Sequence, residues 1–199
     1  MFNDIKRIPT DVTLVSLLKN CSKEKDLCKG IQIHAEISKR NLLEKSLYIG
    51  NALVNMYAKM GGLNLAQEVL GQLPIQDVVS MTSLIAGYAE HGHCDEALKC
   101  FEWLELKGLF LDLVTFVCML KVCASIRLAN KGQELHTDIF KRGLDRELVI
   151  GNALVSMYAG CGCLLEAIGI LEKLPMKTAV SWTALIAAQV ECGYCEDAL

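Results

Sequence analysis

His34 and Glu36, two residues apart, are the first combination in this sequence that could support catalysis. Zinc-dependent deamination of a nucleobase uses such a pair, with the histidine and two cysteines on the metal and the glutamate as proton shuttle. That chemistry also requires a Pro-Cys-x-x-Cys segment. The only Cys-x-x-Cys segment, at 192–195, follows Val-Glu instead of proline. His34 also has a counterpart in the chain, His136, which Thr-Asp follows, so we expect no catalytic residue here.

The ten cysteines could bind a metal or form disulfides. Cys161 and Cys163, with Cys192 and Cys195, would supply four sulfur ligands. The first pair, however, is spaced more closely than the two to four intervening residues usual in structural zinc sites. Other cysteines lie in apolar segments of helical spacing, where cysteine packs as a small hydrophobic residue; these are Cys94, Cys100, Cys118 and Cys123. We therefore expect reduced, packed thiols, with no metal and no other cofactor.

The composition indicates a helical protein. The chain has 199 residues, of which 52% are hydrophobic and only three are proline, and its net charge is −3. No uncharged apolar run reaches the roughly 18 residues that a membrane span needs. The N-terminus resembles neither a signal peptide nor a transit peptide. No phosphate-binding loop, Ser/His/Asp order or pair of catalytic carboxylates stands out.

Internal repetition dominates the sequence. The phrase Gly-Asn-Ala-Leu-Val occupies residues 50–54 and again 151–155, and related phrases surround Thr82, Val117 and Thr183. Each repeat has two apolar segments of helical spacing, and in unit 78–112 Gly92 separates them. A pair of helices this small cannot bury its apolar faces alone. Stacking of successive pairs would complete the core, which predicts a solenoid of two-helix repeats.

The repeats resemble pentatricopeptide repeats over nearly the whole chain. The segment VVSMTSLIAGYAEHGHCDEALKCFEWLELKGLFLD and the later VSWTALIAAQVECGYCEDAL match that motif, whereas the signature of tetratricopeptide repeats does not fit. The alternation of long and short units resembles the plant P-L-S subclass, with GNALVNMYAKMG typical of an S unit and TFVCMLKVCASIRLANKGQELHTDIFKRG of an L unit. The resemblance implies an all-α fold, a right-handed α-α superhelix.

The units expected from this resemblance are 11–46 (L), 47–77 (S), 78–112 (P), 113–147 (L), 148–178 (S) and 179–199 (P, incomplete), with residues 1–10 as the tail of an earlier repeat. Because the last unit stops within the first turn of its expected second helix, we expect the chain to be a piece of a longer array. Any deaminase activity would then lie in a C-terminal domain absent from this chain.

The resemblance implies binding of single-stranded RNA, one base per repeat, read by two positions in each unit. The fifth residues are Val15, Asn51, Thr82, Val117, Asn152 and Thr183, and the last residues are Ser46, Asp77, Asp112, Glu147 and Thr178. Asn, Thr and Asp can hydrogen-bond the edge of a base. Valine cannot, so the two L units should discriminate poorly. In the family, Asn with Asp pairs with U, and Thr with Asp pairs with G. The alternative for Asn51 and Thr82 is a local contact with the backbone of their own helix.

The second residue of each unit sandwiches the bases in the family. These residues are Val12, Tyr48, Val79, Val114, Val149 and Val180. The alternative is that an apolar residue at the start of a helix packs into the core.

The function predicted from the resemblance is sequence-selective RNA binding in a mitochondrion or chloroplast, as the specificity part of a C-to-U editing or RNA-processing factor. Single-stranded RNA and editing-complex proteins are the partners implied, with no membrane and no small-molecule substrate. The acidic net charge is unusual for an RNA-binding chain. The alternative function is a protein-interaction scaffold of the tetratricopeptide kind, whose groove would present lysines or arginines that clamp carboxylates.

Overall fold

The computed structural model describes residues 10–191, except the side chains of residues 188 and 191, and this range folds into α-helices joined by short turns. None of these helices is both long and apolar enough to span a bilayer. Two compact bodies are present, which we call the N-terminal body (Met1–Leu109) and the C-terminal body (Phe110–Leu199). The all-α fold class predicted from the sequence is therefore confirmed for the described residues.

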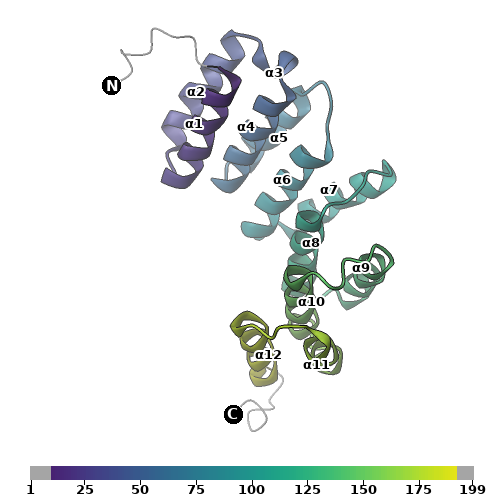
Figure 1. Ribbon diagram of the computed structural model, residues 1–199. Coiled ribbons are helices and arrows are strands. Elements are labelled where there is room, and N and C mark those ends of the chain that lie inside the picture. Colours follow the sequence, from purple (N-terminus) through teal and green to yellow (C-terminus); the bar gives the residue numbers. More distant parts are fainter. Residues whose placement is uncertain (1–9, 192–199) are drawn as a thin grey trace. The chain divides into compact units, whose positions relative to one another are not determined.

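In the N-terminal body, the first helices of successive repeats pack side by side. Helix α4 (Leu47–Lys59) contacts both α1 (Asp11–Glu24) and α6 (Val78–Glu90). The second helices each pair with the first helix of their own repeat, so that the repeats form two layers (Figure 1). These second helices are α2 (Leu27–Lys39), α5 (Leu63–Gln72) and α7 (Cys94–Leu106).

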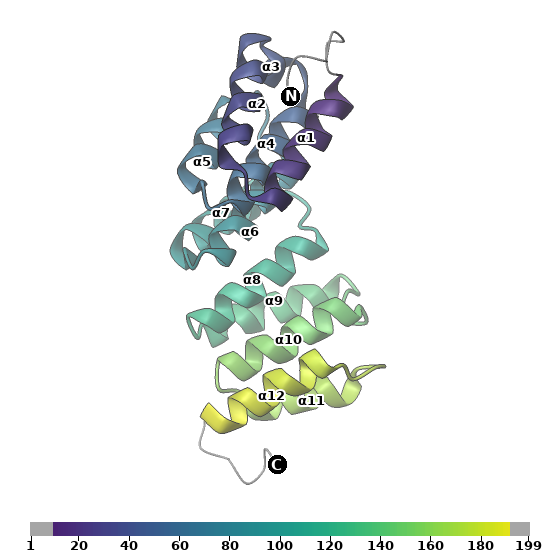
Figure 2. The same cartoon turned by 90° about the vertical axis from the view of Figure 1, so that its left-hand side faces the viewer.

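The C-terminal body repeats this arrangement. Helix α10 (Leu148–Gly160) packs between α8 (Leu113–Ser125) and α12 (Ala179–Glu191). The second helices, α9 (Ala129–Lys141) and α11 (Leu164–Lys173), lie beside α8 and α10 (Figure 2).

Each first helix begins at the first residue of an expected unit, because local signals define these starts. Asp77 and Asp112 precede α6 and α8, and their carboxylates accept hydrogen bonds from the N–H groups of Ser80 and Thr115 at 2.8 Å. Such caps satisfy backbone donors that have no partner within the helix. The assignment of the units to L, S and P classes stays a prediction.

One repeat departs from the two-helix pattern. A third helix of one turn, α3 (Leu42–Lys45), follows α2, and its Leu43 is buried. The sequence has one more residue here than in the second copy, where Gly143 (φ 68°) occupies the place of Asn41 (φ 50°). Both residues adopt the left-handed conformation that ends the preceding helix. The inserted residue is thus accommodated by one additional helical turn.

Packing explains why Gly-Asn-Ala-Leu-Val occurs twice. A Cβ added at Gly50 would collide with the side chain of Leu73, and one added at Gly151 would collide with Leu174. The leucine and valine of each phrase are buried, so the glycine lets Leu73 or Leu174 pack against the helix in its present rotamer.

Candidate nucleic-acid interface

The second residue of every unit is exposed. It lies in the first turn of the first helix, and between 53% and 70% of its surface is accessible. The alternative of core packing is therefore wrong for these six residues: Val12, Tyr48, Val79, Val114, Val149 and Val180. An apolar side chain exposed at the same place in each repeat is suited to contact the face of a base, although the sandwiching role itself stays a prediction.

The fifth residues differ in their surroundings. Val15 and Thr82 are buried, Asn51, Val117 and Asn152 are half-buried, and Thr183 is exposed. The hydroxyl of Thr183 donates a hydrogen bond to the carbonyl of Ala179 at 2.7 Å, which is the local backbone contact considered as the alternative role. The amide of Asn51 makes no such local bond within the described residues and reaches across the repeat instead.

The last residues of the units are N-caps of the following helices. Besides Asp77 and Asp112, Thr178 fulfils this role, because its Oγ1 accepts a hydrogen bond from the N–H of Ser181 at 3.3 Å. Ser46 and Glu147 occupy the same position without a side-chain cap bond. The last residue of each unit therefore marks the start of the following helix.

The two predicted reading residues touch each other in both S units. Asn51 Nδ2 donates to Asp77 Oδ2 at 2.9 Å, and Thr178 Oγ1 donates to Asn152 Oδ1 at 3.3 Å. Asp77 cannot donate, so Asn51 Oδ1 stays buried with no partner among the described residues. Burial would raise the pKa of Asp77, but the hydrogen bonds from Ser80 and Asn51 outweigh it and hold that pKa below its ordinary value. The carboxylate is therefore ionised at neutral pH.

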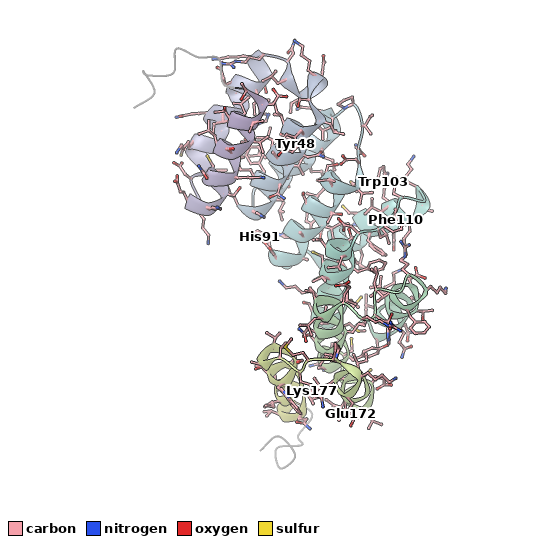
Figure 3. All side chains as sticks on the ribbon, viewed as in Figure 1. Tyr48, His91, Trp103, Phe110, Glu172 and Lys177 are labelled. Carbon is pink, nitrogen blue, oxygen red and sulfur yellow. The ribbon has the colours of Figure 1, made fainter. Side chains whose placement is uncertain are left out.

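A groove of about 550 Å³ surrounds Asn51 in the N-terminal body. Tyr48 projects at the start of α4 (Figure 3), and it lines this groove together with Val79 of α6. Because Val15 also lines it, two of the predicted stacking residues and two of the predicted reading residues share one cavity. The other lining residues are Val15, Lys19, Ser22, Lys23, Ala52, Asn55, Lys59 and Ser83.

Several of these groove residues were missed by the sequence analysis. Asn55 Nδ2 donates to Ser83 Oγ at 3.2 Å and so joins α4 to α6. Lys19 and Lys23 follow Val15 along α1, one and two turns further on. The signal that could have found them is helical spacing from the fifth residue, since residues four apart share one helix face.

Both residues of the His-x-Glu segment make contacts within the repeat array. A hydrogen bond of 3.0 Å joins His34 Nδ1 to the hydroxyl of Tyr57, and Arg40 Nε donates to Glu36 Oε1 at 2.7 Å. The second copy makes the same contact, since His136 Nδ1 lies 3.0 Å from the hydroxyl of Tyr158. Contacts between neighbouring repeats therefore account for both histidines.

The cysteines of the described residues are free thiols. Cys21, Cys94 and Cys123 are buried as expected, but Cys28 is exposed on the surface of α2, so the expectation of packing is wrong for it. Burial raises the pKa of Cys100 and Cys123 to about 11, which keeps both protonated. Within residues 10–191, no group of three or more potential ligands is placed to hold a metal. Cys192 and Cys195 lie outside the described residues.

Stacked helix pairs with a recurring exposed apolar position define a helical-repeat protein. Comparison with known proteins identifies the repeats: residues 76–125 match the PPR repeat family and residues 152–177 match the PPR repeat. These two segments therefore match pentatricopeptide repeats, as the sequence analysis predicted for them. Membership of the P-L-S subclass stays a prediction.

Similar proteins are found in Arabidopsis thaliana. The pentatricopeptide repeat-containing protein At4g18520, chloroplastic, is 34% identical over 96% of this chain and 31% of its own length. The putative pentatricopeptide repeat-containing protein At3g13770, mitochondrial, is 34% identical over 96% of this chain and 30% of its own length. The chain thus spans less than a third of the length of these two relatives.

Solved structures support the fold. The pentatricopeptide repeat protein PPR10 in complex with an 18-nucleotide psaJ RNA element superimposes with a TM-score of 0.74, at 20% identity, over 97% of this chain and 29% of that one. PPR10 from maize gives a TM-score of 0.75 at 17% identity, over 98% and 28%. The chain therefore has the helical solenoid fold of that protein.

Proposed function

We propose that this chain binds single-stranded RNA in a plant organelle, one base per repeat, as the specificity part of a C-to-U editing or RNA-processing factor. PPR10, whose fold it shares, was solved with bound RNA. Relatives named chloroplastic or mitochondrial support an organellar location. Catalysis is not part of the proposal for this chain.

The observation that carries the proposal is the recurrence of one exposed apolar side chain per repeat, together with a polar pair in units 47–77 and 148–178. In the first S unit, Tyr48 lines the same groove as Asn51, whose amide is held by Asp77. A base could stack on the apolar side chain while its edge faces the polar pair. A single-stranded nucleic acid presents one flat base with a polar edge at each step of the strand. A site that recurs from repeat to repeat fits such a ligand.

The reading positions give a base order. Unit 47–77, with Asn51 and Asp77, should prefer U, and unit 78–112, with Thr82 and Asp112, should prefer G immediately 3′ of it. Unit 113–147 should be permissive because Val117 has no hydrogen-bonding group. Unit 148–178 should favour a pyrimidine weakly. A wrong base would leave polar groups of the site unpaired, at a cost of about 1–2 kcal/mol for each mismatch.

The test is competition among short RNAs that vary at the two adjacent positions read by units 47–77 and 78–112. The Thr82→Asn variant should move the second preference from G to U and leave the first unchanged. Because this number of repeats gives limited affinity, the measurement uses the chain extended by additional capping repeats.

Thr137→Asn is the matched control, since Thr137 is an exposed threonine on α9, away from the reading positions. It should leave both preferences as in the parent chain. Equal binding of all four bases at both positions, or a Thr82→Asn variant with unchanged preference, would remove the base-reading assignment.

A further inference from the structure

The groove around Asn51 is basic although the chain as a whole is acidic. Lys19 and Lys23 of α1 and Lys59 of α4 line it, and no aspartate or glutamate is among the described lining residues. None of the three lysines forms an ion pair with any residue of the described range. Three uncompensated positive charges therefore converge on one groove from two neighbouring helices.

This basic cluster belongs to the N-terminal body. In the second copy of the repeats, the counterpart of Lys19 is Lys121, but Ser125 replaces Lys23 and Gly160 replaces Lys59. The same helix position in α6 carries Glu90, with the opposite charge. The shared fold does not require the lysines, since the second copy forms equivalent helices without two of them.

We infer that Lys19, Lys23 and Lys59 bind consecutive backbone phosphates of the RNA, so that the strand is held electrostatically along the N-terminal body and more weakly elsewhere. The inference rests on the proposed RNA binding and says where its charge-dependent affinity comes from. It also accounts for how a chain of net charge −3 can bind a polyanion.

The chemistry of the groove favours phosphates over bases as partners of the lysines. Tyr48 and Val79 offer apolar contact to a base, and Asn51 offers hydrogen bonds to its edge. These residues, and not the lysines, therefore supply the contacts to bases. The lysines are exposed and follow the predicted reading residues by about one to two turns along α1 and α4. An ammonium group on a flexible stem suits a phosphate, to which it contributes charge and not base selectivity.

The experiment compares the parent chain with the triple variant Lys19→Gln, Lys23→Gln, Lys59→Gln. The control triple variant is Lys39→Gln, Lys45→Gln, Lys99→Gln, which removes the same charge from exposed lysines that do not line the groove. Binding of a single-stranded oligouridylate is measured across a salt series. Circular dichroism melting checks that all three proteins fold alike.

The groove variant should lose affinity and salt dependence together. Three phosphate contacts to a single strand give a slope of log K against log salt of about −2, which is about a 20-fold change between 50 and 200 mM salt. The groove variant should lose this component, whereas the control should keep it. An oligouridylate with uncharged methylphosphonate linkages should bind the parent and the groove variant equally, because the lysines would have no phosphates to contact.

The possible failures separate the two proposals. If the parent chain binds no single-stranded RNA, the proposed function fails and this inference with it. If the parent binds RNA but the groove and control variants lose the same affinity, only the phosphate assignment is overturned. Retention of the difference on the uncharged backbone would also overturn it. The phosphate assignment would also be overturned if an acidic peptide bound through the three lysines while RNA binding did not depend on them. The groove would then be a protein-docking site.

Discussion

The polar pairs of the two S units show how one neighbouring side chain sets what an asparagine offers. Asp77 accepts from Asn51 Nδ2, and the carbonyl oxygen of Asn51 is buried with no partner among residues 10–191. Thr178 instead donates to the carbonyl oxygen of Asn152. An unpaired buried acceptor lowers stability, so this oxygen of Asn51 adds nothing to the stability of the fold.

The half-buried histidines His34 and His136 should make stability depend on pH. Burial lowers the pKa of His34 and His136; near His34, Glu68 opposes the shift, while near His136, Lys173 adds to it and Asp145 opposes it. A lowered pKa in the folded state means that the unfolded chain binds protons first, so stability is complete above about pH 6.5 and declines as the pH falls through the folded pKa.

Chemical unfolding at a series of pH values measures this decline. The double variant His34→Gln, His136→Gln should have a flatter profile between about pH 5 and 7, because the titrating groups are gone. The exposed His93 gives the control, since His93→Gln should leave the parent profile unchanged. A parent chain with constant stability over this range would contradict the prediction.

At the scale of the helices, close packing of first helices against one another depends on small residues. A Cβ added at Gly87 of α6 would lie 2.7 Å from Ala58 Cβ and 3.0 Å from its backbone in α4. Backbone atoms cannot move aside as a flexible side chain can. Gly87→Ala should therefore destabilise the N-terminal body by about 1–3 kcal/mol, the usual cost of overpacking.

Gly71→Ala is the matched comparison within the same body. Gly71 lies in α5 with nothing within 4 Å of an added Cβ, so alanine should be neutral there or stabilise the helix by up to about 1 kcal/mol. Free energies of unfolding for both variants decide the matter. Equal effects of the two substitutions would show that α4 and α6 do not pack as closely as described.

At the scale of the whole chain, we expect folding to be independent of bound metal. The described cysteines are free, and Cys21, Cys94 and Cys123 are buried, which gives these three a packing role without zinc. A zinc chelator should leave helicity and melting temperature unchanged. Purified protein that contains stoichiometric zinc, and loses the metal together with its fold, would contradict this.

The repeat architecture could be predicted from the sequence because its signals are local. Capping residues such as Asp77 and turn glycines such as Gly92 mark helix boundaries without reference to the rest of the chain. The groove could not be predicted in this way, because the convergence of Lys19 with Lys59 depends on how α1 packs on α4. The contact between Asn51 and Asp77 likewise joins residues at opposite ends of one unit.

The residue that ends a repeat is also the cap of the helix that begins the next one, and this dual role limits how such a chain can evolve. Few side chains cap a helix well, and they are the short polar ones: serine, threonine, aspartate and asparagine. Ser46, Asp77, Asp112 and Thr178 all come from that set. Glu147, the fifth last residue, lies outside that set and makes no side-chain cap bond. An exchange of one short polar group for another at this position would keep the helix capped, and under the base-reading proposal it would also change what the repeat recognises in a single step.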